Sequence, residues 1–204
     1  MYISRLTYNM PNALAYLNED LTAYSLHQDM WSFFPGMENK SVGPFLYAVV
    51  NPKVLMVSSV QPVCPNSLWT LETRPYKPVF DLGQGLMFDL TFCPSFDLNG
   101  KKKSYIGHFL KPFNAVNGTR GEQVHALIQD WFDRREERLG FKVKGFEVIK
   151  DINRTIPKPG HPFKYNEIAL HGVLEVLDVE KVLHTIYTGV GREKRNGCGL
   201  LLVS

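Results

Sequence analysis

The alternation of hydrophobic and polar positions in the first hundred residues predicts one helix and four strands. Residues 2–8 alternate as a half-buried strand does, and residues 22–34 carry the spacing of an amphipathic helix that ends at a Pro-Gly pair. Residues 45–50 and 54–60 are β-rich runs separated by a proline-containing turn, which predicts a hairpin. The apolar run 86–92 predicts a further strand. This half therefore reads β-α-β-β, a short element and β.

The second half repeats that order. A turn with a charge run at 97–103 marks a candidate boundary. The helix predicted over 122–139 has the clearest apolar stripe in the chain. The remaining predicted elements are strands at 104–109, 142–152 and 165–179, a short helix at about 179–187, and a strand at the C-terminus.

Two copies of one element order predict an α+β protein with two tandem ferredoxin-like (RRM-like) βαββαβ domains. We expect the first at residues 1–96, carrying the helix near position 27. The second is expected at 101–204, with a basic hairpin and a glycine-rich loop. The halves share no obvious sequence repeat, so this prediction depends on element order alone, and a length of 204 residues also suits one domain.

Composition narrows the class of protein. Hydrophobic residues make up 44% of the chain and aromatic residues 12%, enough for a sizeable core. The sequence has neither an apolar run long enough to span a membrane nor the features of a signal peptide. Its three cysteines are widely spaced and form no C-x-x-C pair. These features predict a cytoplasmic protein with no membrane partner and no cysteine-based metal site.

Charge is distributed unevenly along the chain. Residues 1–100 contain five Lys and Arg against eight Asp and Glu, whereas residues 101–204 contain eighteen against twelve. A basic half is typical of a nucleic-acid surface, and an ordinary solvated face is the equally weighted alternative.

The segment before the last strand combines four glycines with three cations. Glycine permits positive φ and close backbone approach, and cations attract phosphate. The spacing fits neither a Walker loop, because Cys198 follows Gly197, nor a dinucleotide fingerprint, because Lys194 occupies the place of its third glycine. We therefore expect an anionic polymer to bind here, at Gly189, Gly191, Arg192, Lys194, Arg195 and Gly197.

His27 lies at the border of the apolar stripe of the first predicted helix, with Tyr24 and Trp31 along the same border. Tyr24 and His27 are three residues apart, so their side chains are neighbours and form a candidate acid–base pair. The alternative interpretation is a hydrogen-bonded packing histidine. No histidine pair has the spacing of a metal site.

Further basic positions lie in predicted turns and on the long helix. A solvated turn is the usual interpretation of a lysine run, and a stiff hairpin tip can grip phosphates. Arg134, Arg135 and Arg138 alternate with Asp133, Glu136 and Glu137, so we interpret them as helix-surface ion pairs. The candidate RNA contacts outside the glycine-rich loop are Lys101, Lys102, Lys103, Arg154 and Lys158.

In combination these motifs resemble the CasE-type CRISPR repeat endoribonucleases, subunits of the type I-E Cascade complex. The resemblance covers essentially the whole chain. It is carried by the Tyr24-x-x-His27-x-x-x-Trp31 helix, by Gly100-Lys101-Lys102-Lys103, by Gly172-x-Leu174-x-Val176-x-Asp178, and most specifically by the glycine-rich segment leading into Leu200-Leu201-Leu202. Glu193 departs from the pattern, since that loop is usually small and basic.

The resemblance implies an endoribonuclease that cuts precursor CRISPR RNA within each repeat, at the base of a stem-loop. It would remain bound to the 3′ hairpin beside other Cascade subunits. The RNA 2′-OH would attack with no metal or other cofactor, leaving a 2′,3′-cyclic phosphate and a 5′-OH. His27 and Tyr24 would handle the protons, in either order, and Lys194 above all would offset charge on the phosphorane.

Two other hypotheses remain. A non-catalytic RNA-hairpin-binding subunit of the same fold would bind RNA and leave it intact. A small-ligand or protein-interaction module, whose glycine loop is merely a tight turn, would show weak and salt-independent RNA affinity.

Overall fold

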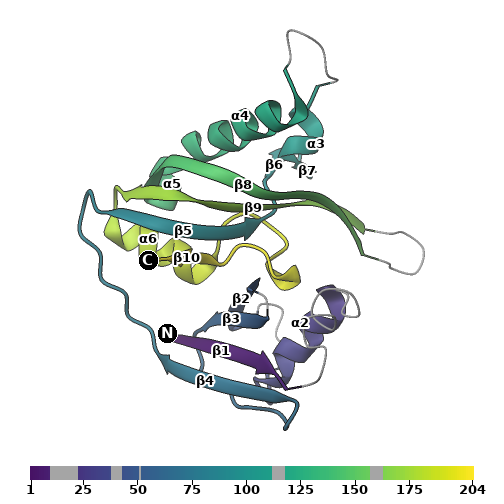
Figure 1. Ribbon diagram of the computed structural model, residues 1–204, viewed down its shortest axis with the longest axis vertical. Helices are drawn as coiled ribbons and strands as arrows, with labels where there is room; N and C mark the ends of the chain where they lie inside the picture. The colour runs from purple at the N-terminus through teal and green to yellow at the C-terminus, as the bar shows by residue number, and fades with distance from the viewer. Residues whose placement is uncertain (10–22, 38–42, 51, 112–117, 157–162) are drawn as a thin grey trace.

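The computed structural model describes residues 1–9, 23–37, 43–50, 52–111, 118–156 and 163–204, and arranges them around two four-stranded antiparallel sheets (Figure 1). The elements of the first unit are β1 (Tyr2–Tyr8), α2 (Ala23–Ser32), β2 (Phe45–Val50), β3 (Lys53–Ser58) and β4 (Trp69–Pro75). Those that follow are β5 (Gly85–Phe92), β6 (Ser95–Leu98), β7 (Lys101–Ser104), α3 (Tyr105–Phe109), α4 (Arg120–Asp133), α5 (Glu136–Leu139), β8 (Phe141–Ile156), β9 (Phe163–Val176), α6 (Val179–Thr188), the 3₁₀ turn η2 (Lys194–Asn196) and β10 (Leu201–Val203).

Both sheets have the strand order of a ferredoxin-like domain. The first runs β2-β3-β1-β4 and the second β10-β5-β9-β8, with every neighbour antiparallel. In each, the unit's first strand lies between its third and fourth, as a split βαβ arrangement requires. The predicted fold class, α+β with two tandem ferredoxin-like domains, is confirmed.

Strand β5 was assigned to the wrong sheet. We expected residues 86–92 to complete the first unit, but β5 pairs with β9 and β10. The fourth place in the first sheet belongs to β4, where Trp69 and Leu71 face inward and polar side chains alternate with them. The sequence does not indicate this strand, because few of its residues are apolar. We accordingly propose a domain boundary within residues 76–84, ahead of the predicted one.

Residues 104–109 were predicted as a strand and are mostly helix. Ser104 ends β7, and its side chain accepts a hydrogen bond from the Gly107 amide, which caps α3. The predicted helix over 122–139 consists of α4 and the short α5. The capping box of α4, in which Thr119 and Glu122 bond reciprocally, fixes its start.

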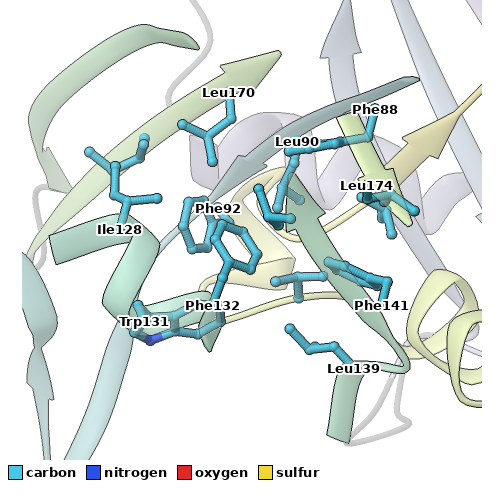
Figure 2. Packing of buried hydrophobic residues seen from close by; sticks show 14 of the residues in the cluster. Phe88, Leu90, Phe92, Ile128, Trp131, Phe132, Leu139, Phe141, Leu170 and Leu174 are labelled. Carbon is cyan, nitrogen blue, oxygen red and sulfur yellow. The ribbon is translucent and has the colours of Figure 1, made fainter. Parts of the chain in front are cut away.

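The larger core lies between the second sheet and its helices. Alternate residues of β5 point into it, and Figure 2 shows Phe92 beside the aromatic side chains of α4. The ring centroid of Phe92 is 5.2 Å from that of Trp131 and 5.5 Å from that of Phe132. This packing fixes the end of β5, from which the β6–β7 hairpin continues.

The first sheet has two covered faces. Leu6, Met56 and Tyr47 pack with α2 on one face. Leu46, Ala48 and Val57 point the other way and pack with Leu200, just before β10. Successive side chains of a strand point to opposite faces of the sheet. One face of the first sheet therefore packs on α2, and the other packs on the C-terminal segment. No helix in the described part of the chain is both long and apolar enough to cross a membrane.

Candidate functional site

Helix α2 presents His27 at the edge of a buried stripe. Leu26, Met30 and Phe33 are buried, which fixes the rotation of the helix, and His27 and Trp31 are half-buried one turn apart on its border. The indole Nε1 of Trp31 donates a hydrogen bond to Nε2 of His27 at 3.1 Å. Phe45 of β2 lies against the same imidazole, with ring centroids 6.1 Å apart. The imidazole is therefore held from two sides.

These contacts define the protonation of His27. Because Nε2 accepts a hydrogen bond, it carries no proton, and the proton of the neutral ring is on Nδ1. Nδ1 is buried and has no hydrogen-bond partner among the described residues. Burial, and next the positive charge of Arg195, lower the pKa of His27 below its ordinary value of 6.5. The ring is consequently neutral at physiological pH, the form required of a general base.

Arg195 reaches this helix because η2 packs on the first unit. The phenol of Tyr47 donates to the Arg195 carbonyl oxygen at 2.8 Å. Gly197 follows, with φ of +80°, and a Cβ added there would lie 3.1 Å from the Tyr47 ring. Figure 1 shows the C-terminal segment crossing between the second sheet and α2. The turn that carries Arg195 is thus anchored to β2 by a hydrogen bond and by close packing.

Two positions of the glycine-rich segment, one near its start and one at its end, are anchored to the end of β5. The Arg192 amide donates to the Cys93 carbonyl at 3.2 Å, and the Gly199 amide donates to the Thr91 carbonyl at 2.6 Å. At Gly191 a Cβ would stand 2.8 Å from the Cys93 oxygen, on a backbone with φ of +73°. These glycines allow close packing of the chain on itself.

Glu193, the acidic departure from the family pattern, is buried. It adopts a left-handed backbone with φ of 59°, and its carboxylate accepts a hydrogen bond from the Asn196 side chain at 2.8 Å. Its charge is turned inward and shapes η2.

Lys194 and Arg195 are consecutive but have different surroundings. The Lys194 Nζ donates to the Thr188 carbonyl at 2.5 Å, and its side chain lines a cavity with Arg192 and Lys102. Arg195 is exposed and is the cation that lowers the pKa of His27. The sequence favoured Lys194 as the cation nearest the chemistry, whereas the surroundings of His27 favour Arg195.

The remaining residues that the sequence predicted as RNA contacts lie at separate places in the structure. Lys101, Lys102 and Lys103 are exposed on β7. Arg154, on the β8–β9 hairpin, forms an ion pair with the buried Glu167, Nε to Oε2 at 3.0 Å. Lys158 lies outside the described residues, and so does the side chain of Tyr24, whose backbone belongs to α2. No group of three His, Cys, Asp or Glu side chains capable of holding a metal ion occurs in the described ranges.

The interpretation of the helix arginines as surface pairs was wrong in detail. Arg134 pairs with Asp130 at 2.9 Å, one turn earlier. Arg135 donates to the Trp131 carbonyl at 2.8 Å and lies over the Trp131 ring. Arg138 lines the same cavity as Lys194. Alternating charge signs on a helix gave no indication that two of these arginines face a cavity.

Comparison with known proteins agrees with this geometry. The model of a family described as CRISPR associated protein matches residues 1–204. The CRISPR system Cascade subunit CasE of Escherichia coli K12 is 24% identical over 186 residues, covering 87% of this chain and 89% of that protein. Cse3 of Thermus thermophilus, solved bound to an RNA representing a pre-cleavage complex, superposes with a TM-score of 0.74 at 24% identity. That match covers 100% of this chain and 98% of Cse3.

The CRISPR-associated protein Cas6e of Escherichia coli K-12 has a TM-score of 0.67 at 22% identity, over 100% of this chain and 99% of that chain. These likenesses show a shared fold along the full length, in agreement with the two ferredoxin-like units described above. Because a family model matches every residue, the chain belongs to the family of CRISPR-associated proteins.

Proposed function

We propose that the protein is an endoribonuclease that cleaves precursor CRISPR RNA within the repeat, at the base of the stem-loop. Its relatives support the reaction class, since Cse3 is named a CRISPR endoribonuclease and was solved with RNA. The observation that carries the proposal is the position of His27: a half-buried imidazole on the border of α2 whose Nε2 accepts a hydrogen bond from the Trp31 indole. Burial and the charge of Arg195 lower its pKa, which favours the neutral, basic form.

RNA contains the nucleophile for this reaction. His27 Nε2 takes the proton of the ribose 2′-OH as the 2′ oxygen bonds to phosphorus, and the bond from phosphorus to the leaving 5′ oxygen breaks. Nδ1 is buried and carries the ring proton, so Nε2 is the basic atom. The 2′-OH then takes the place that the Trp31 indole holds at Nε2.

Charge and the second proton are assigned to neighbouring groups. The Arg195 guanidinium, whose charge already acts on His27, offsets the negative charge that develops on the phosphorane. Tyr24, three residues before His27 in α2, gives its phenolic proton to the leaving 5′ oxygen. Solvent exchange then restores both groups. The products are a 2′,3′-cyclic phosphate and a 5′-OH, and no step requires a metal.

Binding and assembly complete the proposal. The basic C-terminal unit, including the Arg154 hairpin, holds the stem through phosphate and shape contacts, because an A-form stem hides its base edges. The protein remains on the 3′ hairpin as a Cascade subunit. This assembly is proposed from its relatives, of which one is named a Cascade subunit.

The test is a gel assay of hairpin repeat RNA in EDTA, with a matched RNA bearing a 2′-deoxy substitution at the cut site. We expect cleavage of the first RNA only, with a cyclic phosphate at the new 3′ end. Cleavage of the deoxy RNA, or none until Mg²⁺ is added, would contradict the mechanism. Intact RNA with a clear mobility shift would favour the hairpin-binding subunit.

A further inference from the structure

The cavity beside Lys194 is separate from the His27 site. It has a volume of about 610 Å³ and is bounded by the β6–β7 hairpin, the end of α4, α5, α6 and the glycine-rich segment. His27 is not among its lining residues. Lys194 and Arg195 are adjacent in η2, so this one turn borders both the cavity and the His27 site.

Positive charge dominates the cavity. Five cations and His184 line it, against one carboxylate, that of Asp97. The cations are Lys102, Arg135, Arg138, Arg192 and Lys194. Within the described ranges none of the five forms an ion pair, although other lysines and arginines form eight ion pairs in the same ranges. The lining of the cavity therefore carries a net positive charge, because it contains five cations and only one carboxylate.

Two of these cations are fixed in place. Arg135 donates to the carbonyls of Trp131 and Ser95, and its guanidinium lies 4.3 Å from the centroid of the Trp131 ring. The Lys194 ammonium bonds the Thr188 carbonyl, and burial together with the nearby Arg138 lowers its pKa. Like charges held together in this way favour an anionic occupant, since an anion relieves their repulsion.

The cavity wall also contains a partly exposed aromatic ring, which favours nucleic acid over an acidic peptide. Phe96 lines the cavity and is only half-buried, whereas Trp131 is buried beneath the Arg135 guanidinium. Sites for single-stranded nucleic acid combine cations that track the backbone with aromatic faces that stack bases. The volume falls within the range of about 300–1,000 Å³ usual for small-ligand pockets, so a nucleotide-sized group fits.

We infer that this cavity binds a phosphodiester of the single-stranded RNA that flanks the stem-loop, next to the cleavage position. This inference rests on the proposed function for the identity of the RNA. A cut at the base of a stem places single-stranded RNA beside His27, and the strand that leaves over Arg195 meets Lys194 and then Arg138. The cavity thus positions the flank and sets the register of cleavage.

The test compares the affinities of Arg138→Gln and wild type for two uncleavable 2′-deoxy RNAs, one with both flanks and one with the stem-loop alone. Arg138 is exposed and forms no ion pair in the described part of the chain, so the variant should fold. We expect about fivefold to tenfold weaker binding of the flanked RNA, the effect of losing one charge-assisted contact. The slope of log K against log salt should fall by about 0.7 for that RNA. Stem-loop affinity should not change.

Arg134→Gln is the matched control, because Arg134 is also exposed but pairs with Asp130 and does not line the cavity. Equal weakening of both RNAs by Arg138→Gln, or no effect on either, would overturn the inference. So would unchanged RNA binding with loss of association with the other Cascade subunits, which would indicate an acidic protein partner. The proposed function is tested separately. If wild type binds the stem-loop but does not cleave the RNA that has a 2′-OH at the cut site, the protein is not a nuclease, and the comparison of flanked and unflanked RNA still stands.

Discussion

The indole of Trp31 donates to His27 Nε2, the ring nitrogen that the proposed reaction uses as a base. One turn of helix separates the two residues, so the contact is set by the geometry of α2. It favours the tautomer of His27 with the proton on Nδ1, and in the proposed reaction the substrate 2′-OH displaces the indole.

Trp31→Phe should raise the pKa of His27 and weaken its preference for the Nδ1–H tautomer, because a hydrogen bond to the unprotonated nitrogen favours the neutral ring. Imidazole ¹⁵N shifts across a pH titration report both quantities. Trp69→Phe, which changes a tryptophan of the same core away from His27, is the control. An unaltered His27 titration in Trp31→Phe would show that the hydrogen bond does not set the tautomer.

Cleavage should rise with pH and level off, with a midpoint below 6.5, because burial and Arg195 lower the pKa of His27 and only the neutral ring is a base. Arg195→Gln removes the positive charge, so the midpoint should move to higher pH while the plateau rate falls. Single-turnover rates between pH 5 and 8 measure both. A midpoint that stays in place in Arg195→Gln, while Arg134→Gln behaves as wild type, would contradict the coupling.

The same shift affects stability. The lowered pKa means that the unfolded chain binds more protons than the folded one below pH 6.5, so His27 reduces stability as pH falls from 6.5 through the folded pKa. The free energies of unfolding of wild type and His27→Gln, measured by urea denaturation, should therefore approach each other as the pH falls. At acid pH the variant should become as stable as wild type or more stable. A stability difference that is constant with pH would argue against a lowered pKa.

Tyr47→Phe should reduce the cleavage rate more than RNA affinity, because it removes the hydrogen bond that holds the Arg195 carbonyl. The loss of that bond should also destabilise the fold by about 1 kcal/mol. Tyr187→Phe is the matched control, since its hydroxyl makes only a 3.5 Å contact with the Tyr76 carbonyl. Equal rates in the two variants would mean that Tyr47 does not position the turn.

Gly191→Ala should destabilise the protein by about 1–3 kcal/mol, since it combines a strained positive φ with a clash against the Cys93 carbonyl. Gly121→Ala provides the opposite control. Gly121 lies in α4 with open space around it, so alanine there should stabilise by about 0.5–1 kcal/mol. Urea midpoints compare the two. A neutral Gly191→Ala would show that the segment is free to shift.

The spacing of hydrophobic residues along the chain predicted most of the helices and strands, but it did not predict to which sheet each strand belongs. β4 has few apolar positions and was not predicted, so β5 was placed in the first unit instead, whereas in the structure β4 pairs with β1 and β5 pairs with β9. Strand pairing depends on packing between residues far apart in the chain, which a local pattern does not contain. The predicted first unit therefore included a strand of the second.

The candidate site was also only partly predictable from the sequence. The border position of His27 followed from helical geometry, and its link to the glycine-rich segment followed only from the family resemblance. The different surroundings of Lys194 and Arg195 depend on the buried Glu193 and on the Tyr47 anchor, contacts between residues distant in sequence. The position of Arg138 at a cavity could not be predicted for the same reason, since the cavity is assembled from three stretches of chain, residues 95–102, 131–139 and 184–194.

The most direct test of the central claim is the single-turnover cleavage rate of a hairpin repeat RNA by wild type and His27→Ala, measured beside their affinities for the 2′-deoxy RNA. We predict a loss of about 10²–10⁴-fold in rate, the usual contribution of a positioned general base, with unchanged affinity. A His27→Ala variant that binds and cleaves at close to the wild-type rate would contradict the account and make His27 a packing residue.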